Sequence, residues 1–171
     1  MQQHLHIIAL DVPYPVDYGG VYDLFYKLPA LHECGVQVHL HCFDNGRGVQ
    51  PELDQYCASV NYYPRKTGWK GVASNLPYIV SGRKNETLHH NLLKDDYPIL
   101  MEGVHCSYPV FDKRFDGRKK WVRLHNVEHL YYRKLWQYAS NDPIKKIYYA
   151  AESRLLKRYE AALAKKKVAF L

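Results

Sequence analysis

The sequence predicts a doubly wound α/β fold with a parallel sheet of about six strands, because three observations agree. Short β-like runs alternate with helical segments along the chain, which is typical of strands joined by helical crossovers. The first run, residues 4–10, is almost continuously apolar, as expected of a strand covered on both faces. Right-handed crossovers then predict the strand order 3-2-1-4-5-6.

Length and composition fit one globular domain. The chain has 171 residues, of which 47% are hydrophobic and 24% charged, a balance that supports a buried core. No apolar run approaches the ~18–20 residues that span a bilayer, and the amino terminus lacks the features of a secretory signal. The four cysteines form no CxxC pair, so we expect reduced thiols in a cytoplasmic protein.

The first half of the chain is expected to supply three strands. The loop at residues 11–20, with two prolines and two glycines, follows the first strand. A helix should follow, kinked or split by Pro29 and stopped by Gly35. Its apolar face has helical spacing: Val21, Leu24, Phe25, Leu28 and Leu31.

The next elements are shorter. Residues 36–43 and 59–63 predict the second and third strands, with a short helix at 51–57 between them. A weak helical segment at 68–82 is interrupted by Pro77.

Another short helix at 85–94 leads to strand four at 97–102, and strand five spans 120–125. Two strong helices close the chain, the first at 126–139 and the second from Ile144 onward. Their expected apolar faces are Val127, Leu130, Tyr131, Leu135 and Tyr138, and Ile147, Tyr148, Ala151, Leu155, Tyr159, Ala162 and Leu163.

Asp142 and Pro143 form an N-cap with proline at the first helical position. Residues 168–171 start a sixth strand that lacks its following turn. We therefore expect residues 1–171 to be the N-terminal piece of a longer protein.

Ligands of open α/β sheets bind at the carboxyl ends of the strands, and this rule selects the candidate residues. Strand one leads to Asp17, Tyr18, Gly19 and Gly20, where glycines before a helix let backbone N–H groups approach an anion. A tight strand-to-helix turn is the alternative interpretation.

Strand four ends at Glu102, and strand five leads to His125, Asn126 and Glu128. The imidazole of His125 can donate or accept a hydrogen bond near neutral pH. Glu128 suits the first turn of a helix, and it alternatively serves only as a cap.

These residues resemble a known family. Residues 17–20, the helix after them and residues 35–40 look like the start of a family-four-like glycosyltransferase of the GT-B fold. Residues 123–132 look like the middle of that family's N-terminal domain, and residues 158–160 and 168–171 like the elements before its hinge. Residues 44–118 match only as generic sheet and helix.

The resemblance implies one Rossmann-like half of a two-domain enzyme. This half would hold the acceptor, and the C-terminal, donor-binding domain is absent from this chain. The resemblance implies that His125 lies near the transferred sugar and is the catalytic candidate. The loop of Asp17, Tyr18, Gly19 and Gly20 would approach the donor diphosphate and acceptor, and we assign Glu102, Asn126 and Glu128 to acceptor binding.

Two other interpretations concern histidines and basic residues. His4 and His6 share one strand face, as do His39 and His41, so a zinc or copper site is conceivable. No acidic or thiolate ligand is placed with them, and we expect no metal and no cofactor beyond the nucleotide sugar as co-substrate.

The net charge of +7 is concentrated in residues 113–171, with 16 basic and 5 acidic side chains. No nucleic-acid motif accompanies this charge, so we expect no nucleic acid as partner. The mixture of aromatic and basic residues at 131–136 instead suits contact with an anionic membrane at its inner face, or a solvated helix face with aromatic rims in the core.

The sequence therefore predicts the acceptor-side domain of a retaining, hexosyl-type glycosyltransferase of polysaccharide biosynthesis. It would use a nucleotide sugar and a glycan or lipid-linked acceptor, and it would be inactive as an isolated fragment. The alternative is a Rossmann-like binding or interaction module without chemistry of its own.

Overall fold

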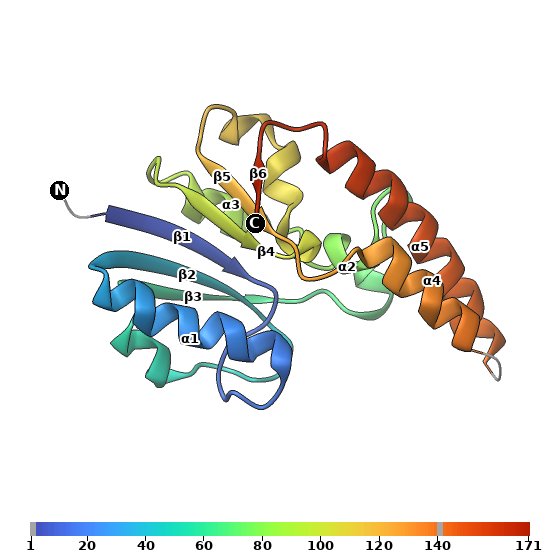
Figure 1. Cartoon of the computed structure of the whole chain (residues 1–171), viewed down its shortest axis with the longest axis horizontal. Helices are drawn as coiled ribbons and strands as arrows, with labels where there is room; N and C mark the ends of the chain where they lie inside the picture. Colours follow the sequence, from blue (N-terminus) through green and yellow to red (C-terminus); the bar gives the residue numbers. More distant parts are fainter. Residues whose placement is uncertain (1–2, 140–141) are drawn as a thin grey trace.

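The computed structural model describes residues 3–139 and 142–171, and it confirms the expected sheet (Figure 1). Six parallel strands have the order β3-β2-β1-β4-β5-β6. The strands are β1 (Gln3–Ala9), β2 (Val36–Asp44), β3 (Ser59–Pro64), β4 (Ile99–Glu102), β5 (Lys120–Arg123) and β6 (Ala169–Phe170). The strand order reverses between β1 and β4, so the carboxyl ends of these strands flank the position where such sheets bind ligands.

Helices cover both faces of the sheet. The α-helices are α1 (Gly19–Glu33), α2 (Tyr78–Ser81), α3 (Glu86–Leu92), α4 (Glu128–Tyr138) and α5 (Pro143–Leu163). Five 3₁₀ helices join them: η1 (Pro51–Gln55), η2 (Gly68–Gly71), η3 (Val104–Cys106), η4 (Tyr108–Phe111) and η5 (Lys113–Phe115). Within the described ranges, none of the helices is long and apolar enough to cross a membrane.

Alternating side chains of the central strands pack into two separate hydrophobic cores, one on each face of the sheet. On one face, α1 buries Leu24 and Leu28 against Ile7 of β1 and Leu40 of β2. The opposite core contains Ile8 of β1 with residues from α2, α3, the 3₁₀ segments and α5. The near-continuous apolar sequence of β1 thus reflects burial on both faces, as expected for a central parallel strand.

Most of the expected helices are present. Pro29 lies inside α1, which continues to Glu33 and is not split. The short helix expected at 51–57 is the 3₁₀ helix η1, and the weak segment at 68–82 forms η2 and the four-residue α2, which begins directly after Pro77. Asn85 and Asp142 do cap α3 and α5, since their side chains accept hydrogen bonds from the backbone N–H groups of Leu88 and Lys145.

The expected apolar faces of α4 and α5 were wrong in large part. The two helices pack against each other and extend away from the sheet (Figure 1), so one side of each faces solvent. Tyr138 is 83% exposed and Ile147 is 72% exposed. Tyr159 and Leu163 of the expected face are buried, and the other buried positions of α5 are Glu152 and Leu156.

Two carboxylates of α5 explain how this helix is anchored. Glu152 accepts hydrogen bonds from the backbone N–H groups of Tyr78 (2.9 Å) and Ile79 (3.1 Å), at the start of α2. Glu160 accepts one from the N–H of Glu128 (2.8 Å), at the start of α4, and also contacts His129. Each carboxylate thereby satisfies donors that a helix start leaves unpaired.

Candidate active site

Glu102 and His125 meet at the carboxyl ends of β4 and β5. Glu102 ends β4 and lies in register with Arg123, the last residue of β5. The Nε2 atom of His125 lies 3.2 Å from Oε2 of Glu102. The side chain of Glu102 is 1% exposed, whereas that of His125 is 24% exposed. The imidazole therefore stands between a buried carboxylate and solvent.

Two further cations contact the same carboxylate. Lys27, from the third turn of α1, forms an ion pair with Oε1 of Glu102, and Nη1 of Arg123 lies 3.4 Å from Oε2. Both cations also reach Asp23 of α1, which Arg123 contacts directly and Lys27 approaches to 3.8 Å. The network ties α1 to the ends of β4 and β5.

The pKa of Glu102 is held at about 2. Burial alone would raise it, but hydrogen bonds from His125 and Lys27 and the charges of Lys27 and Arg123 outweigh that effect. Glu102 is therefore ionised at neutral pH and only accepts hydrogen bonds. Consequently Nε2 of His125 must carry the hydrogen, and in the neutral imidazole Nδ1 is left as an acceptor.

Gly103 places a second imidazole beside His125. Its φ is +77° and its ψ is 166°, a combination that is essentially restricted to glycine. A Cβ at this position would lie 3.0 Å from Nδ1 of His105 and 3.2 Å from Cδ2 of His125. Burial and the nearby charges of Arg83 and Arg65 lower the pKa of His105 to about 3. Its buried Nδ1 has no hydrogen-bond partner among the described residues.

The loop after β1 reaches the same edge of the sheet. Tyr18 is the N-cap of α1, which begins at Gly19. Asp23 lies one turn further along α1 and contacts Arg123. At a rise of about 1.5 Å per residue, the start of α1 is therefore within roughly a helical turn of the network around Glu102.

Contacts of Asp17 and Tyr18 hold the loop before α1 in place. Asp17 pairs with Arg47, whose guanidinium carbon lies 5.2 Å above the ring of Tyr18. The hydroxyl of Tyr18 donates to Asp11 (3.0 Å), and burial together with the Asp11 carboxylate raises the pKa of Tyr18 to about 12. A Cβ at Gly20 would lie 2.6 Å from Cε2 of Tyr18, whereas one at Gly19 would meet nothing within 4 Å. Gly20 thus leaves room for the Tyr18 ring, and the backbone at Gly19 is open.

Asn126 and Glu128 take different positions. Asn126 is exposed and lines a hollow of about 270 Å³ with Leu124, Val127 and Phe170. Glu128 is 4% exposed at the first residue of α4. Burial raises the pKa of Glu128, while a hydrogen bond with Asn126 opposes the rise. The structure therefore places Asn126 at the surface and Glu128 behind it.

Four residues of this site were not predicted from the sequence: Lys27, Asp23, Arg123 and His105. Lys27 and Asp23 lie four residues apart, so they share a helix face, but the pattern does not reveal what that face contacts. Arg123 could have been predicted more easily, because it ends the strand next to Glu102. His105 lies in the 3₁₀ segments after β4, which the sequence left unassigned.

The paired histidines form hydrogen-bonded rows across the sheet. His6 Nδ1 lies 2.8 Å from His41 Nε2, and His41 Nδ1 lies 2.9 Å from the Tyr63 hydroxyl. Asp95 accepts a hydrogen bond from Nε2 of His6 (2.8 Å), and Nδ1 of His4 lies 3.1 Å from Nε2 of His39. Among the residues that the structure covers, no group of three or more potential ligands could hold a metal ion. These imidazole nitrogens are instead engaged with one another and with their neighbours.

The sheet order and the position of the site define a Rossmann-like α/β domain. No family model matches the sequence, and no solved structure matches it. The chain is related to an uncharacterized 44.6 kDa protein in the cps region of Klebsiella pneumoniae, with 29% identity over 154 residues. The match covers 85% of this chain and 39% of that relative, so the chain spans well under half of the relative's length.

Proposed function

We propose that this chain is the N-terminal, acceptor-side domain of a GT-B glycosyltransferase in polysaccharide biosynthesis. The full protein would transfer a sugar from a nucleotide sugar to a glycan or lipid-linked acceptor, with retention. The observation that carries the proposal is the Glu102–His125 pair at the carboxyl ends of β4 and β5, beside the switch in strand order. The sequence resemblance and the relative from a capsule (cps) region support it.

In this proposal His125 contacts the transferred sugar. Glu102 fixes the hydrogen on Nε2, so Nδ1 of the neutral ring can accept a hydrogen bond from a sugar hydroxyl or stabilise positive charge that develops at the reacting carbon. Glu102 is a positioning residue, because it is 1% exposed and its contacts are with Lys27, Arg123 and His125. This differs from its expected direct contact with the acceptor.

The start of α1 is the proposed anion-facing element. Backbone N–H groups at the first turn of a helix are unpaired and favour a phosphate, and the backbone at Gly19 is open. The donor diphosphate would approach here from the second domain. Asn126, at the exposed side of the same edge, would contact the acceptor, with Glu128 supporting it through their hydrogen bond.

We also propose that α4 contacts an anionic membrane. Tyr131 is 49% exposed and Trp136 is 38% exposed, and Arg133 and Lys134 are exposed beside them. Aromatic rings and cations on one helix suit an anionic interface. Replacing Tyr131 and Trp136 by alanine should reduce co-sedimentation of the full protein with phosphatidylglycerol vesicles several-fold, and unchanged sedimentation would remove α4 from this role.

Transfer activity of the full-length protein tests the enzyme proposal. The protein is incubated with labelled uridine, guanosine and adenosine diphosphate sugars, with and without lipid-linked or glycan acceptor. We expect acceptor-dependent release of a nucleoside diphosphate with label in the acceptor. Tight binding of sugars without any turnover would instead favour a non-catalytic Rossmann-like module.

Calorimetry on the 171-residue chain tests which half holds the donor. We expect nucleotide sugars to bind weakly or not at all, because the donor-binding domain is assigned to the other half. Micromolar binding by this chain would show that the donor site lies in this domain, contrary to the proposal.

A further inference from the structure

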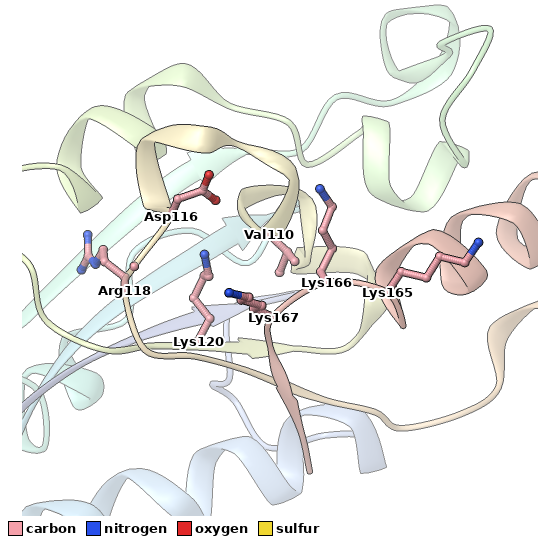
Figure 2. Close-up of a pocket in the computed structure, with 8 residues that line it drawn as sticks. Val110, Asp116, Arg118, Lys120, Lys165, Lys166 and Lys167 are labelled. Atoms are coloured by element: carbon pink, nitrogen blue, oxygen red, sulfur yellow. The ribbon is translucent and has the colours of Figure 1, made fainter.

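A basic hollow lies at the amino end of β5, away from the carboxyl ends that carry Glu102 and His125. It has a volume of about 570 Å³. It is lined by Val110, Asp116, Gly117, Arg118, Lys120, Lys165, Lys166 and Lys167 (Figure 2). The lining residues come from η4, the loop after η5, the first residue of β5 and the turn after α5. Three separate stretches of the chain therefore converge on one strongly positive concavity.

Three of these lysines are directed toward the hollow. In Figure 2 the side chains of Lys120, Lys166 and Lys167 gather around it, with Asp116 beside them, while Lys165 points away. Arg118 is also occupied elsewhere, because its guanidinium donates to the carbonyls of Tyr97 and Leu92 and pairs with Asp95. The local balance is thus three ammonium groups and one carboxylate.

Hydrogen bonds fix the turn that carries Lys166 and the side chain of Lys120. Lys166 donates its N–H to the carbonyl of Leu163 (3.0 Å) and accepts from the N–H of Val168 (2.9 Å), which fixes the turn between α5 and β6. Lys120 is 8% exposed, and its ammonium donates to the carbonyl of Phe115. In the parts of the chain that the structure describes, none of the three lysines forms an ion pair with a carboxylate.

Like charges held together without paired carboxylates repel one another, and an anion in the hollow relieves that repulsion. Burial lowers the pKa of Lys120, and the neighbouring charges of Arg118 and Lys166 lower it further, against the influence of Asp116. Lys120 and Lys166 are therefore close enough to affect each other. The Lys166 ammonium lies over the ring of Phe111, 5.2 Å from its centroid, so the hollow keeps an excess of positive charge that a carboxylate does not neutralise.

We propose that this hollow binds a dianionic phosphate group through Lys120, Lys166 and Lys167. Three ammonium groups and one carboxylate leave about two positive charges, which match a phosphate monoester of charge about −1.5 to −2 at neutral pH. Lysine binds phosphate as a compact point charge. A single carboxylate ligand would leave the hollow positive.

The test measures binding of inorganic phosphate to the full chain by calorimetry at constant ionic strength. The informative variant is Lys166→Gln/Lys167→Gln, which removes two cations from exposed positions. The matched control is Lys66→Gln/Lys70→Gln, which removes the same charge from exposed positions outside the hollow. We expect saturable binding that weakens at least tenfold in the first variant and less than twofold in the control.

Vesicles distinguish a lipid phosphate from a soluble one. Phosphatidylcholine vesicles with phosphatidic acid carry a phosphate monoester, and vesicles with phosphatidylglycerol at equal surface charge do not. Preferential binding to phosphatidic acid that inorganic phosphate displaces would identify a lipid source, and binding of inorganic phosphate alone would identify a soluble one. No saturable binding up to about 10 mM inorganic phosphate, or equal weakening in both variants, would overturn the proposal.

Discussion

Glu102 and His125 form a carboxylate–imidazole pair with 3.2 Å between Oε2 and Nε2. The two residues are 23 positions apart in sequence, and the pairing of β4 with β5 brings them together. Glu102 is buried and ionised, and His125 faces outward from it. The pair therefore couples the stability of the sheet edge to the orientation of an accessible imidazole.

Glu102→Gln should lower the free energy of unfolding by about 1–3 kcal/mol, since it removes the buried carboxylate that Lys27 and Arg123 share, while Asp23 still contacts both cations. Urea unfolding at pH 7 measures the change. Glu33→Gln, at an exposed position at the end of α1, is the control and should stay within about 0.5 kcal/mol of wild type. A loss below about 1 kcal/mol for Glu102→Gln would show that the network contributes little to stability.

Glu102→Gln should also change how the free energy of unfolding depends on pH in acid. The folded pKa of Glu102 is about 2, below the ordinary value of 4.5. Its contribution is therefore complete above about pH 5 and is lost as the pH falls toward 2, in total roughly 3 kcal/mol. Unfolding curves between pH 5 and 2 should fall less steeply for Glu102→Gln than for wild type. Parallel curves would contradict the assigned pKa.

His41→Gln should reduce the pH dependence of the free energy of unfolding between pH 7 and 5. Burial lowers the pKa of His41 to about 3 from 6.5, and the neighbouring charges of His6, His39 and Arg118 act in the same direction. The unfolded chain therefore takes up the proton first, so stability is present above pH 6.5 and falls below it. Between pH 7 and 5 His41 should account for about 2 kcal/mol of the loss.

The His41 measurement is chemical unfolding at pH 8, 7, 6 and 5. Glutamine can still hydrogen-bond the Tyr63 hydroxyl that His41 contacts, and the comparison at pH 8 isolates any packing defect. The assignment fails if the variant loses as much stability between pH 7 and 5 as the wild type.

Gly103→Ala should disturb both the backbone and His125. The φ of +77° at this residue disfavours any Cβ, and the added atom would contact His105 and His125. We expect about 1–3 kcal/mol of destabilisation and a loss of transfer activity in the full-length protein. Gly35→Ala is the control, because Gly35 has a φ of +75° and no heavy atom within 4 Å of its added Cβ. Equal residual activities in the two variants would argue against precise placement of His125 by Gly103.

The sequence predicted the fold more fully than the site. Alternating strands and helices, together with right-handed crossovers, led to the observed strand order. The α4–α5 pair was misjudged because apolar spacing identifies a helix but does not say whether a partner covers it. Ile147 fits the helical stripe, yet it is 72% exposed where the pair extends from the sheet.

Some site residues could be predicted from the sequence and others could not. Strand ends could be located from sequence, so Glu102 and His125 were expected at one edge. Lys27 could not be assigned, since its contact with Glu102 spans 75 positions and depends on how α1 packs. Glu160 likewise serves the start of α4 from a distant turn of α5. Such contacts arise from tertiary packing and leave no local pattern.

Turnover of His125→Ala in the full-length protein, measured with its thermal midpoint, tests the central claim most directly. Loss of a hydrogen-bonding group placed at the reacting sugar should lower turnover about 10²–10³-fold, while the midpoint changes little because the imidazole is partly exposed. His90→Ala, at an exposed position of α3, should retain turnover. Near-normal turnover of His125→Ala would remove His125 from the mechanism, and a collapse of the midpoint with proportional loss of activity would assign it a structural role.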